Sequence, residues 1–169
     1  DVCSSDLTHN EPIVPVEGGY LYGWHYPDKV NLKEGIQVLY HEALASAKAI
    51  AVYHSMNLSG EIGIILNLTP TYPRDEHNEA DVNAAKFVDG FFNRSFLDPA
   101  VKGHFPEDMV AWAKANDLLP ETTPEDLAII AENTVDLLGV NYYQPRRAKA
   151  KETPVETRPE GLLPEDFYD

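Results

Sequence analysis

Two apolar segments constrain the fold of this chain most strongly. The run at 62–66 is continuously apolar and rich in β-branched residues, and the run at 135–143 is mainly aliphatic and aromatic. Short runs of this kind are typical of strands buried on both faces of a parallel sheet. Segments in which apolar residues recur at helical spacing lie before and between them, at 35–56 and 79–92, and from 106 and 124 onward. This order predicts an α/β protein with a parallel sheet and right-handed crossovers.

The periodicity leaves two architectures open, an open doubly wound sheet and a closed barrel. No Gly-rich phosphate loop supports a nucleotide-binding fold. Thr123 followed by Pro124 is typical of a helix start, with Thr as the N-cap. Beyond Gln144 the composition shifts to charged residues and Pro, which we interpret as a long surface loop.

Composition excludes several classes of protein. The 169 residues carry 13 Lys and Arg against 28 Asp and Glu, a net charge of −15 that disfavours nucleic acid and anionic membranes as partners. The single Cys excludes a disulfide framework and a Cys-based zinc site. His41-Glu42 has no second His four residues after the first, so we expect no metal site, and no cofactor. No apolar run reaches the ~18 residues that span a membrane, and no signal peptide is evident, so we expect a soluble, cytoplasmic protein.

The segment Thr8-His9-Asn10-Glu11-Pro12 is the strongest candidate for chemistry. It follows an expected strand end, and Pro12 restricts the backbone beside a carboxylate and an amide. Asn10 could donate to a sugar hydroxyl while Glu11 moves a proton. On the residues alone, a simple turn explains the segment as well.

The chain resembles the family 1 glycoside hydrolases, the β-glucosidase clan. Segments similar to the family's motifs occur in its order over about 8–145: Thr8-x-Asn10-Glu11-Pro12, Gly19-Tyr20-x-x-Gly23, His41-x-x-Leu44, Phe96-Leu97-Asp98-Pro99, Thr123-Pro124-Glu125-Asp126 and Gly139-Val140-Asn141-Tyr142-Tyr143. The resemblance implies part of a (β/α)₈ TIM barrel, from the end of the fourth strand through the sixth. It also implies retaining glycoside hydrolysis, which uses two carboxyl groups.

The resemblance assigns roles to four residues. Glu11 matches the acid/base, and Asn10 matches the residue that binds the sugar 2-hydroxyl. Tyr143 matches the tyrosine that orients the nucleophile, and Asn141 a polar group beside it. The nucleophile's Thr/Ile-Glu-Asn-Gly motif is not found, and Glu132-Asn133-Thr134 does not match it. We therefore expect this chain alone to be inactive.

The subgroup most similar to this chain is the bacterial 6-phospho-β-glucosidases, on the segments 11–20 and 139–147. A small phosphorylated β-glucoside is then the expected partner, with the oligomeric state left open. Two alternatives are a β-glucosidase or β-galactosidase for unphosphorylated sugars, and a non-catalytic carbohydrate-binding barrel. Arg146 and Arg147 could attract a phosphate, but a solvated loop is the simpler interpretation.

The first seven residues resemble the translation of a widely used sequencing adapter. We expect 1–7 to be a non-native leader and 8–169 to be part of a single TIM-barrel domain. Among the aromatic residues, we expect Trp112 in the core, whereas Trp24 and Tyr26 could stack on a sugar.

Overall fold

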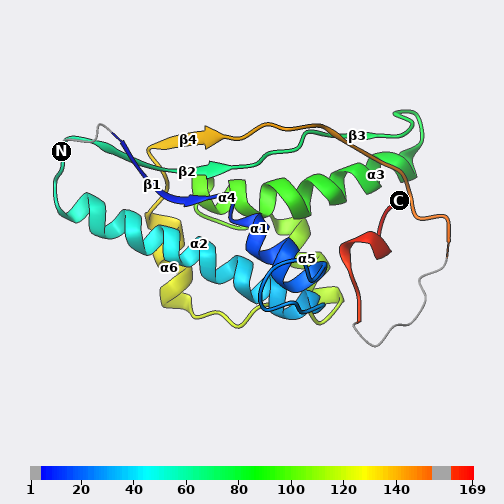
Figure 1. The fold of residues 1–169 in the computed structure, drawn as a ribbon, viewed down its shortest axis with the longest axis horizontal. Helices are drawn as coiled ribbons and strands as arrows, with labels where there is room; N and C mark the ends of the chain where they lie inside the picture. The colour runs from blue at the N-terminus through cyan, green and yellow to red at the C-terminus, as the bar shows by residue number, and fades with distance from the viewer. Residues whose placement is uncertain (1–4, 154–160) are drawn as a thin grey trace.

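The computed structural model describes residues 5–153 and 161–169 (Figure 1). The strands are β1 (Ser5–Asn10), β2 (Glu61–Leu66), β3 (Thr71–Pro73), β4 (Leu137–Val140) and β5 (Arg146–Ala148). The α-helices are α1 (Ile13–Val16), α2 (Leu32–Ser55), α3 (Glu79–Asp89), α4 (Ser95–Lys102), α5 (Glu107–Ala115) and α6 (Pro124–Glu132). Two π-helical turns, η1 (Glu17–Leu21) and η2 (Gly90–Arg94), and a 3₁₀ turn, η3 (Pro164–Asp166), complete the elements.

The main sheet has three parallel strands in the order β1-β2-β4. In Figure 1 the helices lie on one side of β2 and β4. The α/β class with a parallel sheet is therefore confirmed. Strand β1 includes Ser5–Leu7, paired with β2. The origin of residues 1–7 stays a prediction, and residues 1–4 of that segment lie outside the described residues.

The burial of strand β4 differs from the prediction. Ile62, Ile64 and Leu66 of β2 are buried as expected, but β4 alternates, and Val140 is 51% exposed. The physical reason is position, because β2 is central whereas β4 pairs with only one strand among the described residues. An apolar run at a sheet edge has the same sequence pattern as a run in its middle.

The segment after Gln144 is also more ordered than predicted. Strand β5 pairs in parallel with β3, and Ala148 is buried. The backbone N–H of Ala150 donates to the Asp81 carboxylate at 2.8 Å. The interpretation of the described part of this segment as a surface loop is wrong, because a second two-stranded sheet holds it. Residues 154–160 of that segment lie outside the described residues.

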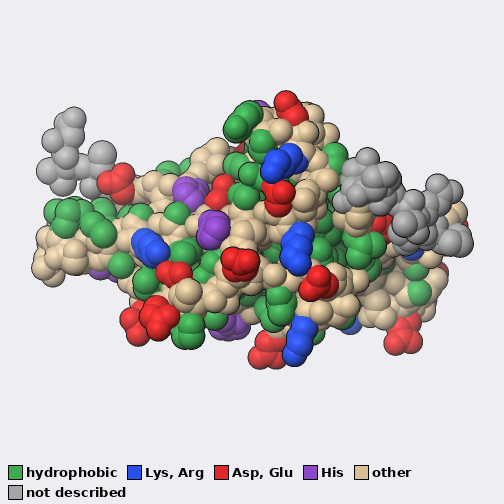
Figure 2. All heavy atoms as spheres, turned by 90° about the horizontal axis from the view of Figure 1, so that it is seen from below, with side chains coloured by type: hydrophobic (Ala, Val, Ile, Leu, Met, Phe, Trp, Pro, Cys, Tyr) green, Lys and Arg blue, Asp and Glu red, His purple; other side chains and the backbone are tan. Residues whose placement is uncertain are grey.

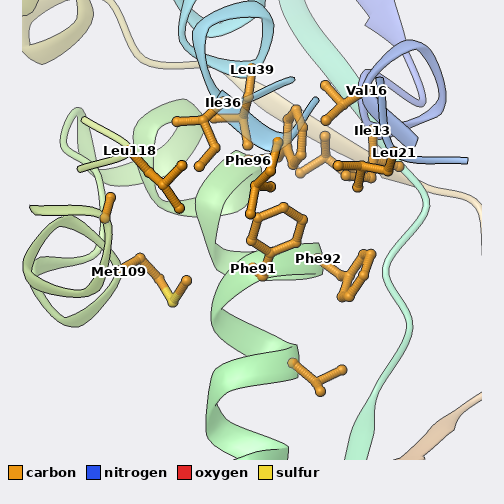
Figure 3. Packing of buried hydrophobic residues seen from close by; sticks show 14 of the residues in the cluster. Ile13, Val16, Leu21, Ile36, Leu39, Phe91, Phe92, Phe96, Met109 and Leu118 are labelled. Atoms are coloured by element: carbon orange, nitrogen blue, oxygen red, sulfur yellow. The ribbon is translucent and has the colours of Figure 1, made fainter. Parts of the chain in front are cut away.

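The predicted helices are present. Helix α2 starts three residues earlier than expected, at an N-cap where the Asn31 side chain accepts from the Glu34 N–H at 3.1 Å. Thr123 caps α6 in the same way, at 3.1 Å from the Asp126 N–H. Buried apolar side chains from α1, α2, η2 and α4 pack into one core (Figure 3). This core supports the segment that follows β1.

The surface seen from below carries acidic, basic and apolar side chains side by side rather than in separate regions (Figure 2). In the part of the chain that the structure describes, no helix is both long enough and apolar enough to cross a membrane.

Candidate active site

Glu11 lies directly after β1, where the backbone departs from regular geometry. Leu7 is opposite Gly63, but Asn10 is opposite Ile65, so β1 contains one residue more than β2 over this stretch. This β-bulge is followed by a positive φ of 53° at Glu11. Such strain in a non-glycine residue is concentrated at functional sites, and bulges re-aim the side chains beside them.

Backbone hydrogen bonds hold Glu11 in this conformation. Its N–H donates to the Ile65 carbonyl at 2.9 Å, and its carbonyl accepts from the Val14 N–H at 3.0 Å. The carboxyl group is therefore fixed between the end of the sheet and the first helical turn.

Four polar side chains meet at the carboxyl ends of β1 and β4. Asn141 Nδ2 donates to Glu11 Oε1 at 2.8 Å and to Asn10 Oδ1 at 3.1 Å. The Tyr143 hydroxyl donates to the same Glu11 oxygen. Asn141 is placed by its own N–H, which donates to the Leu66 carbonyl at 2.9 Å. These are the four candidate residues predicted from the sequence, and the structure brings all of them together.

In this structure the Tyr143 hydroxyl donates to Glu11. The role that the resemblance implied for Tyr143, orienting a nucleophile, stays a prediction. The hydrogen bond to Glu11 raises the pKa of Tyr143 above that of an ordinary phenol. The hydroxyl is therefore protonated, and able to donate, throughout the neutral range.

An ion pair holds the segment that carries Asn141 and Tyr143. Arg146 Nη2 lies 3.1 Å from Glu17 Oε1, and the guanidinium carbon lies 3.8 Å from the centroid of the Phe92 ring. Burial raises the pKa of Glu17, and Arg146 opposes that shift. The interpretation of Arg146 as part of a solvated loop is wrong, whereas Arg147 is exposed as expected. Sequence reasoning missed the pair because 129 positions separate its members and no periodicity links them.

The three aromatic candidates for the core or for sugar stacking differ in how far they are buried. Trp112 packs against Phe87 and Phe91, with ring centroids 5.1 and 6.1 Å away, so its placement in the core is confirmed. Trp24 and Tyr26 are 54% and 92% exposed. Their stacking on a sugar stays a prediction. Over residues 5–153 and 161–169, no three His, Cys, Asp or Glu side chains are grouped so as to hold a metal ion.

Comparison with known proteins identifies the family. The profile described as "Glycosyl hydrolase family 1" matches residues 1–161. The chain belongs to this family. Its family 1 relatives include the 6-phospho-beta-glucosidase GmuD of Bacillus subtilis (strain 168), which is 60% identical over 164 residues that make up 96% of this chain and 35% of that protein. Beta-glucosidase A of Acetivibrio thermocellus is 32% identical over 85% of this chain and 32% of its own length.

Solved structures similar to this chain belong to the same family as the relatives found by sequence. A beta-glucosidase from Exiguobacterium marinum is 31% identical and superposes with a TM-score of 0.78 over 90% of this chain and 35% of its own. Family 1 beta-glucosidases of this kind are TIM barrels. The chain spans about a third of the length of the curated relatives it matches.

Proposed function

We propose that this chain is the segment of a retaining 6-phospho-β-glucosidase that carries the acid/base carboxyl group, Glu11. The cluster of Glu11, Asn10, Asn141 and Tyr143 is the observation that carries the proposal. A carboxyl group at a strand end, fixed by backbone and side-chain donors, is what proton transfer to a glycosidic oxygen requires. The intact cluster also weighs against a non-catalytic sugar-binding barrel.

The hydrogen bonds distinguish the two oxygens of Glu11. Asn141 and Tyr143 both donate to Oε1. In the proposed mechanism Oε1 therefore stays an acceptor, and Oε2 carries the proton. Glu11 gives that proton to the leaving oxygen and later takes one from the attacking water. Asn10 lies beside Glu11 and accepts a hydrogen bond from Asn141. In the proposal it binds the sugar 2-hydroxyl, a contact that strengthens in the transition state.

The reaction also requires a second carboxyl group, the nucleophile. In the proposal it bonds to the anomeric carbon as the glycosidic bond breaks and Glu11 protonates the leaving oxygen, and water then displaces it from that carbon. In the proposal, β1, β2 and β4 are the fourth, fifth and sixth strands of a (β/α)₈ barrel, and the nucleophile comes from a part of the barrel outside this chain. Retention requires it about 5–5.5 Å from the acid/base carboxyl group. The sugar then binds at the carboxyl ends of the strands, where several loops meet.

The preference for a phosphorylated sugar rests on the 60% identity to the Bacillus subtilis enzyme. The second candidate is hydrolysis of unphosphorylated β-glucosides, which is favoured by the β-glucosidases among the relatives at about a third identity.

The test uses the complete enzyme that contains this segment. Turnover is compared for p-nitrophenyl β-glucoside 6-phosphate, its unphosphorylated counterpart and the galactoside 6-phosphate. We expect kcat/KM to favour the phosphorylated glucoside by about 100-fold or more. A preference for the unphosphorylated sugar supports the second candidate, and no turnover of any of the three contradicts both.

A further inference from the structure

A small cavity lies behind the bulge of β1, between that strand and helices α2 and α4. Its volume is about 20 Å³. Its polar lining comes from His9 on β1, Glu42 and Ser46 on α2, and Asn133 after α6. His9 is next to Asn10, so the cavity lies one residue away from the proposed catalytic cluster.

Two buried polar atoms belong to residues that line this cavity. His9 Nδ1 and Glu42 Oε2 have no hydrogen-bond partner among the described residues. A buried polar atom left unpaired costs about 1–3 kcal/mol. Burial raises the pKa of Glu42 to about 7 and lowers the pKa of His9, so neither side chain is favoured as an isolated charge there.

The size and lining of the cavity select its occupant. A cavity of ~10–15 Å³ is enough for one water molecule, provided that it offers two to four polar partners. His9 Nδ1 and Glu42 Oε2 supply two, and the Ser46 hydroxyl supplies a third, since its 2.7 Å hydrogen bond to Thr8 Oγ1 leaves further capacity. An apolar occupant would leave both buried atoms unpaired.

We propose that this cavity binds one water molecule, which bridges His9 and Glu42 and fixes the β1 bulge, so that Glu11 is held in position for proton transfer. His9 and Glu42 are then positioning residues, and this role rests on the function proposed above. The bridge forms the second connection between the bulge and α2, beside the direct Thr8–Ser46 hydrogen bond. The two connections hold adjacent residues of β1, just before Asn10 and Glu11.

Substitutions in the complete enzyme test the role of the pair. Glu42→Leu removes one of the three partners of the water, Glu42→Gln keeps a hydrogen-bonding group, and Lys33→Leu changes an exposed residue on the same helix. Substrates with a poor, alkyl leaving group need the proton from Glu11, and 2,4-dinitrophenyl substrates do not. We expect Glu42→Leu to lower kcat/KM, which reports the step that Glu11 assists as an acid, by about 10- to 100-fold for the alkyl substrate only. Glu42→Gln should keep most of the activity, and Lys33→Leu should match the unsubstituted enzyme.

Equal losses of kcat/KM on both substrates, or no loss on either, would overturn the positioning role. The second measurement is a crystal structure of the unsubstituted enzyme at a resolution that shows ordered water. We expect one water within hydrogen-bond distance of His9 Nδ1 and Glu42 Oε2. An empty cavity, or a direct His9–Glu42 hydrogen bond, overturns the inference even if the enzyme is fully active. If the unsubstituted enzyme is inactive, the proposed function fails, and the positioning role fails with it.

Discussion

The Tyr143 hydroxyl donates a hydrogen bond to Oε1 of Glu11, although the two residues are 132 positions apart in the sequence. The bond joins the carboxyl ends of β1 and β4 across the central strand β2. Neighbouring strands lie ~4.8 Å apart, so the two backbones are about 10 Å apart and the long phenol side chain closes the distance. Asn141 donates to the same oxygen at 2.8 Å, and one carboxyl oxygen therefore receives two donors.

Replacing Tyr143 with Phe in the complete enzyme should weaken catalysis while leaving the fold intact. A hydrogen bond to a charged group contributes about 1.5–3 kcal/mol, so kcat/KM should fall by about 10- to 100-fold. The matched control is Tyr142→Phe, on the neighbouring residue, which is 61% exposed. Equal effects of the two substitutions on kcat/KM would show that the bond to Glu11 has no catalytic role.

Arg146 should be important for the stability of the fold. Arg146→Met leaves Glu17 without its partner and removes the cation from the Phe92 ring. Removing one member of a buried ion pair lowers the free energy of unfolding by about 3–5 kcal/mol. The loss should be somewhat smaller here, because the Arg146 side chain is 32% exposed. Arg147→Met, at an exposed position, should change the free energy of unfolding by about 0.5 kcal/mol or less.

A double-mutant cycle separates the ion pair from other effects of Arg146. If the two side chains stabilise each other, the double variant Glu17→Gln/Arg146→Met should lose clearly less free energy of unfolding than the two single variants lose together. Urea unfolding measures this free energy. Additive costs would mean that the pair is not coupled.

Glu42 should make the stability of the complete enzyme depend on pH. Burial raises its pKa from 4.5 to about 7, so the folded state binds this proton more tightly than the unfolded state does. The resulting stabilisation is complete below about pH 4.5 and is lost as the pH rises through about 7. Gln is neutral at every pH, so the decrease in Tm between about pH 5 and 7.5 should be smaller in Glu42→Gln. Parallel Tm curves for the two proteins would contradict the assignment.

The isolated 169-residue chain should be inactive and prone to self-association. No described strand pairs with the outer edges of β1 and β4, and unpaired edges favour association with other chains. Size-exclusion chromatography with light scattering should show oligomers, and aryl β-glucoside 6-phosphates should not be turned over. A monodisperse, active monomer would contradict the assignment of the chain as part of a barrel.

The cluster around Glu11 could be predicted from the resemblance to family 1 but not from hydrophobic patterning, because the segment 4–9 before Asn10 and Glu11 is mainly polar. Parallel strands bring their carboxyl ends to one edge, so residues that directly follow the strands meet there. The Glu17–Arg146 pair could not be predicted in this way, because Arg146 lies in a charged, Pro-rich segment whose pattern resembles a loop. The bulge of β1 could not be predicted either, since the extra residue becomes apparent only from the register with β2.

The most direct test of Glu11 as the acid/base is the leaving-group dependence of Glu11→Gln in the complete enzyme. Gln cannot donate the proton, so kcat/KM for an alkyl β-glucoside 6-phosphate should fall by about 10²- to 10⁴-fold. For the 2,4-dinitrophenyl substrate, kcat/KM should change little, because its leaving group departs without protonation. The same loss of kcat/KM on both substrates, or no loss on either, would contradict the role of Glu11.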